Sequence, residues 1–149
     1  MSKLYFAYGS NLWLEQMTER CPNHRFIGKG ILKGYRWIIS KRGVANIIKS
    51  ETDEVQGIVY EVTKSDEDIL DRKEGVKSGS YRKEMLTLEV DGQNHSCLVY
   101  VDPIIQQGKA REEYIERINK GISGSKLSPE YIRQYIRVFI PESSNRVED

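Results

Sequence analysis

Cysteine and histidine are both scarce in this chain, which weakens the case for a metal centre or a nucleophilic triad. The 149 residues include two cysteines, Cys21 and Cys97, and two histidines, His24 and His95. The cysteines lie far apart without the spacing of a metal site, so we expect two separate reduced thiols. Neither histidine belongs to a catalytic motif. The sequence therefore predicts no metal site.

An excess of one charge and long apolar runs are also missing. The chain has 23 basic and 22 acidic residues, so no strong field recruits nucleic acid or an anionic membrane. No apolar run reaches the roughly 20 residues that span a bilayer, and the start of the chain has neither a basic leader nor a cleavable apolar segment. Walker and dinucleotide-binding glycine patterns are absent too. We expect a cytoplasmic protein whose partner must be inferred from a specific site.

The order of strand and helix patterns predicts one α+β domain over residues 1–142, followed by a polar C-terminal tail over 143–149. β-Branched and aromatic residues with interspersed glycines predict strands between residues 26 and 60, and Asp91-Gly92 predicts a β-hairpin. Helices are expected over residues 11–20, 65–74 and 111–120, and from Ser128-Pro129 onward. The expected architecture is a small, mixed, mostly antiparallel β-barrel or curved sheet with peripheral helices.

The helix expected over residues 111–120 has an apolar face. Tyr114, Ile115 and Ile118 share this face, and Glu113 and Arg117 have the spacing of an i,i+4 ion pair. The helix is expected to end at Lys120, and Gly121 and Gly124 are expected to loosen the connection that follows.

A strand that runs into a glycine turn stands near the start of the chain. Leu4 to Tyr8 is an aromatic, apolar run of strand length, and Gly9-Ser10-Asn11 then breaks the pattern. Glycine permits close approach of the backbone, while serine and asparagine side chains accept hydrogen bonds from nearby backbone N–H groups. Such a turn directs unpaired N–H groups to one place, where they bind anions. By itself, the turn does not indicate which reaction, if any, the protein catalyses.

Glu74 is the acidic residue that the fold alone explains least well. The helix before it is predicted to begin with Ser65 as its cap and to end with Gly75 as a left-handed cap. A glutamate in the last turn opposes the helix dipole by about 0.3–1 kcal/mol. It is either a surface residue screened by Arg72 and Lys73, or a general base with a raised pKa. The local sequence leaves both interpretations open.

Three segments in order resemble the signature segments of the γ-glutamylcyclotransferase family: Tyr5 to Leu12, Glu54 to Tyr60 and, above all, Leu70 to Tyr81. A weaker match at Leu127 to Tyr131 extends the resemblance to most of the chain. The resemblance implies a small β-barrel with peripheral helices, an enzyme without a cofactor, and a small-molecule substrate that carries a γ-glutamyl group. It also implies that Glu74 is the catalytic acid/base. The implied substrate-binding residues are Tyr5, Tyr8, Gly9, Ser10, Asn11, Leu12, Tyr81 and Tyr131.

The chemistry of this family suits the residues. In a γ-glutamyl amide, the α-amine attacks the side-chain carbonyl and leaves 5-oxoproline, so the protein needs no nucleophile of its own. Glu74 moves the protons, and the N–H groups of Gly9 to Leu12 hold the substrate carboxylate or the oxyanion. Tyr81 and Tyr131 wall the pocket and donate hydrogen bonds. We therefore expect Glu74 to lie across one pocket from the glycine turn.

Two other functions fit parts of the sequence. One is a non-catalytic module of the same fold that senses a carboxylate metabolite, and the other is an assembly protein whose Tyr114 and Ile118 stripe binds a partner. For the enzyme, the substrate is a γ-glutamyl amino acid, a γ-glutamylamine or a γ-glutamyl-protected intermediate. The glutathione-specific branch is disfavoured because the turn lacks that branch's glycine-serine-leucine form. The resemblance also permits a homodimer, which the sequence itself does not show.

Overall fold

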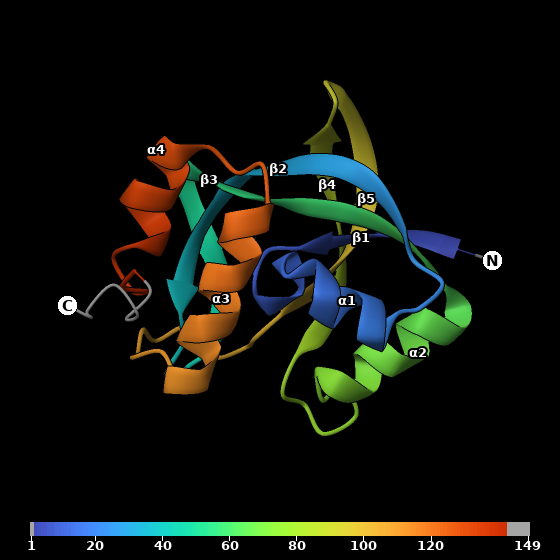
Figure 1. Cartoon of the computed structure of the whole chain (residues 1–149), viewed down its shortest axis with the longest axis horizontal. Helices are drawn as coiled ribbons and strands as arrows, with labels where there is room; N and C mark the ends of the chain where they lie inside the picture. Colours follow the sequence, from blue (N-terminus) through green and yellow to red (C-terminus); the bar gives the residue numbers. More distant parts are fainter. Residues whose placement is uncertain (1, 143–149) are drawn as a thin grey trace.

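The computed structural model describes residues 2–142, so the predicted tail at 143–149 lies outside the described residues. In the described part, five strands form a closed barrel in the order β1-β3-β2-β4-β5. The neighbours pair antiparallel, except that β1 and β5 meet in parallel at Tyr5 and Leu98. The prediction of a small, mostly antiparallel barrel is confirmed (Figure 1). The strands are Ser2–Ala7 (β1), Arg25–Ile39 (β2), Ala45–Thr63 (β3), Arg82–Val90 (β4) and Gln93–Val101 (β5).

The two longest strands, β2 and β3, form a curved antiparallel pair that crosses the molecule (Figure 1). The pairing shifts in register between Phe26 and Gly28 and again between Lys33 and Tyr35, and such irregularities let a strand bend. Glycine is required where β1 lies against β3, because a Cβ on Gly57 would overlap the backbone of Ala7. This close approach fixes the end of β1, and with it the turn that follows.

Local turn and cap signals predict their elements well. Asp91 and Gly92 have φ values of 52° and 81°, as a tight hairpin turn requires. Gly75 has a φ of 67° and ends the second helix. Ser128 caps the last helix, because its side chain accepts a hydrogen bond from the Tyr131 N–H at 3.1 Å. Each of these predictions is confirmed.

Helices surround the barrel (Figure 1). A short 3-10 turn, η1 (Ser10–Leu12), leads into α1 (Leu14–Arg20), and α2 (Lys64–Lys73) follows β3. The prediction that Ser65 caps α2 is wrong. The cap is Thr63, whose Oγ1 accepts a hydrogen bond from the Asp66 N–H at 3.1 Å, because β3 runs directly into the helix without a linker. The last helices are α3 (Glu112–Gly124) and α4 (Pro129–Tyr131), which continues into a π-helical segment, η2 (Ile132–Ile136).

Helix α3 packs directly on the turn after β1. The prediction that it ends before Gly121 is wrong, since the helix continues to Gly124. A Cβ on Gly121 would lie 2.8 Å from the Cβ of Leu12 and 2.9 Å from the backbone nitrogen of Trp13. This glycine therefore serves close helix packing rather than helix termination.

One hydrophobic core fills the barrel and the space under the helices. Trp37 is completely buried, and its indole Nε1 donates a hydrogen bond to the Tyr8 carbonyl at 2.8 Å. Tyr114 and Ile118 are 8% and 0% exposed and belong to this core. The hypothesis that they form an exposed partner-binding stripe is therefore wrong. Helical periodicity identifies a buried face, but it does not say what buries it.

Cys21 and Cys97 are both buried and free, as predicted. Within residues 2–142, no helix is long and apolar enough to cross a membrane. Over the same range, His, Cys, Asp and Glu side chains form no group of three or more that could hold a metal ion.

The contact of α3 with the turn predicts opposite effects for two glycines on one helix. Gly121→Ala places a methyl group against Leu12 and Trp13, so the free energy of unfolding should fall by roughly 1–3 kcal/mol. Gly124→Ala meets open space, so it should change stability by less than about 1 kcal/mol, in the stabilising direction. Urea denaturation of both variants checks this. Equal effects would show that α3 does not rest on the turn.

Candidate active site

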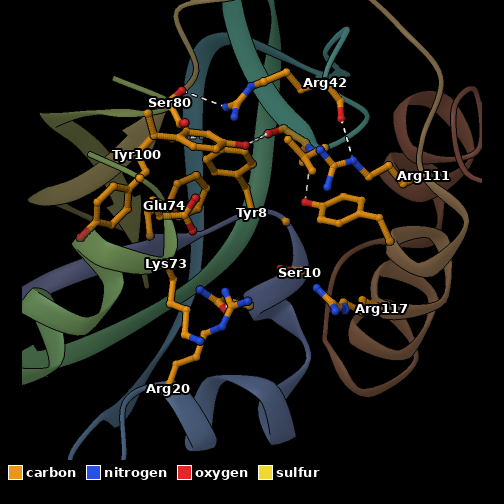
Figure 2. Close-up of a pocket in the computed structure, with 18 of the residues that line it drawn as sticks. Tyr8, Ser10, Arg20, Arg42, Lys73, Glu74, Ser80, Tyr100, Arg111 and Arg117 are labelled. Atoms are coloured by element: carbon orange, nitrogen blue, oxygen red, sulfur yellow. Dashed lines mark hydrogen bonds between the residues drawn. The ribbon is translucent and has the colours of Figure 1, made fainter. Parts of the chain in front are cut away.

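One cavity of about 260 Å³ lies where the turn after β1, the end of α2, the start of β4 and helix α3 meet (Figure 2). Glu74 and the glycine turn share this cavity, which is the arrangement that the sequence predicts. The residues of the predicted site that line it are Tyr5, Tyr8, Gly9, Ser10, Asn11, Glu74 and Tyr81.

The side chain of Asn11, which is only 3% exposed, holds the turn in place. Its Nδ2 donates a hydrogen bond to the Tyr5 hydroxyl at 2.9 Å. Its Oδ1 accepts hydrogen bonds from Gln16 Nε2 at 2.8 Å and from Arg20 Nη1 at 3.2 Å. The expected hydrogen bond from a backbone N–H is thus replaced by bonds from two side chains of α1. Asn11 shapes the site, but its amide is already engaged.

Gly9 lies against α3, where a Cβ would be 2.7 Å from the Tyr114 hydroxyl. This close approach, rather than an unusual φ, is the reason for glycine here. Inside the turn, the Leu12 N–H donates to the Gly9 carbonyl at 3.0 Å, since a 3-10 turn closes on itself after three residues. The N–H of Leu12, expected to hold the substrate, is therefore used by the turn. The N–H groups of Gly9, Ser10 and Asn11 are not part of these internal bonds.

Glu74 stands at the end of α2, where Gly75 turns the chain into the loop that leads to β4. Within residues 2–142, its carboxyl group forms no hydrogen bond and no ion pair. Burial raises the pKa of Glu74 to about 7, and the guanidinium groups of Arg20 and Arg42 act in the opposite direction. A carboxyl with a pKa near neutrality both accepts and returns a proton readily.

Two other carboxylates of α2, Glu67 and Asp71, are paired, whereas the fully buried Asp66 has no hydrogen-bond partner in the described chain and does not line the cavity. Glu67 accepts hydrogen bonds from Lys83 Nζ at 2.5 Å and from Lys3 Nζ at 3.0 Å. Asp71 accepts from Lys83 Nζ at 3.0 Å and from the Tyr100 hydroxyl at 2.7 Å. Lys83 thereby joins α2 to β4. The paired carboxylates anchor the helix, and unpaired Glu74 is left to the cavity.

The tyrosines that line the cavity differ in where their protons go. Tyr8 and Tyr81 donate their hydrogen bonds to backbone carbonyls of the barrel, at 2.6 and 2.7 Å. The proton of Tyr81, expected to serve the ligand, is therefore committed to the fold. Tyr5 and Tyr114 accept hydrogen bonds at 2.9 and 3.1 Å, and their own protons find no acceptor in the described part of the chain. Burial raises the pKa of Tyr114 to about 12 and also raises that of Tyr5, so both hydroxyls stay protonated.

Arg42 fixes the loop after Glu74 to the barrel. Its Nη2 lies 2.9 Å from an oxygen of the fully buried Asp102 carboxylate and donates a hydrogen bond to the Ser80 carbonyl at 2.8 Å. The guanidinium group also stacks 5.0 Å from the centre of the Tyr81 ring. Arg42 therefore has a structural role even though it lines the cavity.

Two residues of the predicted set, Leu12 and Tyr131, do not line the cavity. Both are buried in the core, and Tyr131 packs on Tyr135 with 5.3 Å between ring centres. Among the side chains that do line it, the local sequence did not point to Arg20, Arg42, Tyr100, Arg111, Tyr114 and Arg117. Tyr114 and Arg117 had a signal of another kind, Tyr114 through its place on a helical stripe and Arg117 through its spacing from Glu113. The others lie in segments that only the tertiary fold brings together.

Comparisons with known proteins agree on one family. The pattern of the AIG2-like family matches residues 54–135. The human protein named gamma-glutamylcyclotransferase is 32% identical in an alignment of 141 positions that covers 87% of this chain and 75% of that protein. The mouse protein of the same name is 31% identical in an alignment of 161 positions, gaps included, that covers 98% of this chain and 84% of that protein. A solved structure named gamma-glutamyl cyclotransferase superposes with a TM-score of 0.85 at 28% identity and covers 96% of this chain and 90% of its own.

The raised pKa of Glu74 predicts a pH-dependent cost in stability. Between about pH 4.5 and 7, the folded protein keeps a proton that the unfolded chain has lost, so the stability contribution of Glu74 falls as the pH rises. Glu74→Gln removes this cost. The variant should match the parent near pH 5 and exceed it by roughly 1–3 kcal/mol near pH 8, as measured by denaturant unfolding. A variant that is less stable at both pH values would mean that the carboxylate makes a favourable contact.

Proposed function

We propose that this chain cyclises a γ-glutamyl amide to 5-oxoproline and releases the free amine. The premise is that the chain belongs to the AIG2-like family and, within it, to the γ-glutamylcyclotransferases. The relatives that carry this name match most of the chain and most of their own length. The activity is therefore proposed for the whole domain.

One observation carries the assignment of the acid/base. Glu74 is a carboxyl group without a partner, held in a cavity opposite a tight glycine turn, with a pKa raised to about 7. Burying a carboxyl group without a partner costs stability, and the neighbouring Glu67 and Asp71 are both neutralised by Lys83. Asp66 on the same helix is also without a partner, but it is fully buried and does not line the cavity. The unpaired carboxyl group that a substrate in the cavity can reach is therefore that of Glu74, which favours a catalytic role for it.

In the proposed mechanism, Glu74 first takes a proton from the α-ammonium group of the substrate. The free α-amine then attacks the γ-carbonyl carbon and forms a five-membered ring with a tetrahedral oxyanion and a protonated ring nitrogen. As the oxyanion collapses, Glu74 gives its proton to the leaving nitrogen and the bond to that nitrogen breaks. The ring nitrogen then gives its extra proton to the carboxylate of Glu74, and the released amine takes up that proton, so both protons lost by the α-ammonium group end on the leaving amine. The reaction consumes no water and needs no covalent intermediate. Holding the substrate in the ring-closing conformer supplies much of the acceleration.

Hydrogen-bond donors for the oxyanion are available beside the glycine turn. Tyr114 lies against Gly9 and keeps a proton without an acceptor in the described chain, and Tyr5 does the same on the adjacent wall. The N–H groups of Gly9 and Asn11 add neutral donors to this region. Preorganised donors of this kind stabilise developing negative charge more strongly than water does. Tyr5 and Tyr114 thus take the hydrogen-bond donor role that the sequence predicts for Tyr81 and Tyr131, while Tyr81 still lines the cavity.

Turnover of a γ-glutamyl amino acid tests the function directly. The purified protein should release 5-oxoproline, and Glu74→Gln should lower kcat by roughly 10²–10⁴-fold. Asp68→Asn is the matched control, because Asp68 lies on the same helix but is exposed and paired with Lys64. A Glu74→Gln variant with the parent's rate would remove Glu74 from catalysis. Stabilisation by substrate without any turnover would instead support the metabolite-sensing module.

The pH dependence follows from the same carboxyl group. Because the base must be ionised, kcat/KM should fall about tenfold for each pH unit below about pH 7. Arg20→Gln removes a cation that lowers the pKa of Glu74, so the limb of the profile should move to higher pH. A profile that stays flat between pH 5 and 7 would contradict the assignment.

A further inference from the structure

The cavity is much more basic than the protein that contains it. The chain as a whole has a formal net charge of +1. At pH 7, a Glu74 with a pKa of about 7 is only about half ionised, which makes the excess of positive charge larger still. A cleft with one sign of charge attracts ligands of the opposite sign. Five cationic side chains line the cavity against two carboxylates: Arg20, Arg42, Lys73, Arg111 and Arg117 against Glu74 and Glu113.

Two cations that line the cavity, Lys73 and Arg117, form no hydrogen bond or ion pair within residues 2–142. Lys73 adjoins Glu74 on the α2 side, and Arg117 lies on the α3 side. Arg42, by contrast, is committed to Asp102. The i,i+4 pairing of Glu113 with Arg117 that the sequence predicts is not formed, although α3 does pair Lys120 with Glu116 at 3.8 Å. The guanidinium group of Arg117 is thus available to a ligand.

Arg111 supports the same side of the cavity. Its Nε donates a hydrogen bond to the Arg42 carbonyl at 3.0 Å, which orients the guanidinium group. Its terminal nitrogens have no partner in the part of the chain that the structure describes. In Figure 2, Arg111 and Arg117 lie on the α3 side of Ser10, while Glu74 and Lys73 lie on the α2 side. The unpaired acid/base and the unpaired arginines therefore face the cavity from different walls.

The reaction fixes which end of the substrate lies at Glu74. This step rests on the proposed function: the α-amine and the leaving nitrogen must both come within hydrogen-bond reach of that carboxyl group. The wall across the cavity from Glu74 carries Arg111 and Arg117, which can receive the substituent on the leaving nitrogen. We propose that Arg117, assisted by Arg111, forms a subsite for an anionic group on the leaving amine and so determines which γ-glutamyl amides are used.

The guanidinium group suits this task because it binds a carboxylate through two parallel hydrogen bonds, a geometry that lysine cannot reproduce. Leaving amines that bear a carboxylate, as amino acids do, gain these bonds. Amines with a neutral tail leave Arg117 unpaired, and amines with a cationic tail are repelled. The subsite thus separates γ-glutamyl amino acids from γ-glutamylamines, two substrate classes that the sequence leaves open.

Two substrates that differ only in the charge of the leaving amine test the proposal. One is γ-glutamylalanine, and the other is the same compound with the carboxylate of its alanine replaced by a carboxamide. The parent protein should prefer the carboxylate by about 10–100-fold in kcat/KM. Arg117→Gln should bring this ratio close to one by slowing the carboxylate substrate alone, and Arg117→Lys should give an intermediate ratio. Lys109→Gln is the matched control, because Lys109 is an exposed cation of the preceding segment that does not line the cavity.

Charge reversal provides a second, independent variant. Arg117→Glu should turn the preference toward γ-glutamyl-ethylenediamine, whose tail is cationic. The midpoint of thermal unfolding shows whether each variant is folded. Because Arg117 is half-buried and forms no hydrogen bond or ion pair within residues 2–142, the midpoint of each variant should stay close to that of the parent protein.

Several results would overturn the inference. Equal losses on both substrates in Arg117→Gln would mean that Arg117 holds the γ-glutamyl head or only the fold, and equal use of both by the parent would mean that no tail subsite exists. If no substrate yields 5-oxoproline, the proposed function fails instead. In that case, calorimetric binding of the same two compounds to the parent and to Arg117→Gln still decides the subsite: a carboxylate preference that disappears in the variant supports it, and an unchanged preference rejects it.

Discussion

The hydrogen bonds of Asn11 hold together the parts of the molecule on which the site depends. Its side chain joins Tyr5 on β1 to Gln16 and Arg20 on α1, and its carbonyl accepts a hydrogen bond from Tyr60 on β3 at 3.3 Å. A buried amide without these partners would cost about 1–3 kcal/mol, so the turn has few alternative conformations. The same contacts place Arg20 near Glu74 and orient the Tyr5 hydroxyl. One asparagine therefore fixes both the shape of the cavity and part of its electrostatic field.

The carboxylates of α2 show how one helix combines anchoring with reactivity. Lys83 reaches from β4 to Glu67 and Asp71, and Asp71 in turn holds Tyr100 on the wall of the cavity. Glu74 has no such cation at contact distance in the described chain. Functional sites often retain groups that weaken the fold locally, and the surrounding structure compensates for the loss. Here the compensation lies on the same helix, one and two turns earlier, where the paired charges of Asp71 and Glu67 secure the element that carries Glu74.

Local chemistry predicted much of the fold. Asp91-Gly92, Gly75 and Ser128-Pro129 each specify a backbone conformation through the residue types themselves, either because glycine lacks a Cβ or because the side chain caps a helix, so a single sequence is enough to locate them. Glu74 and the glycine turn could be assigned through their resemblance to a family. The predictions that were wrong concern residues whose packing partners come from distant parts of the chain. Gly121 is a packing glycine because Leu12 lies against it, Tyr114 is buried because the turn covers it, and Tyr131 belongs to the core rather than the site. No pattern within one helix reports such neighbours.

The way in which the barrel closes also determines when the site comes into existence. β1 pairs along its length with the end of β3 and meets β5 at Tyr5 and Leu98, so the first strand of the chain waits for partners encoded far downstream. Such long-range pairing slows folding and leaves strand edges open in the interval. The glycine turn is attached to β1 and rests on α3, which is encoded later still. The cavity therefore has all its walls only once α3 has packed on the turn, and a chain that lacks α3 lacks one of them.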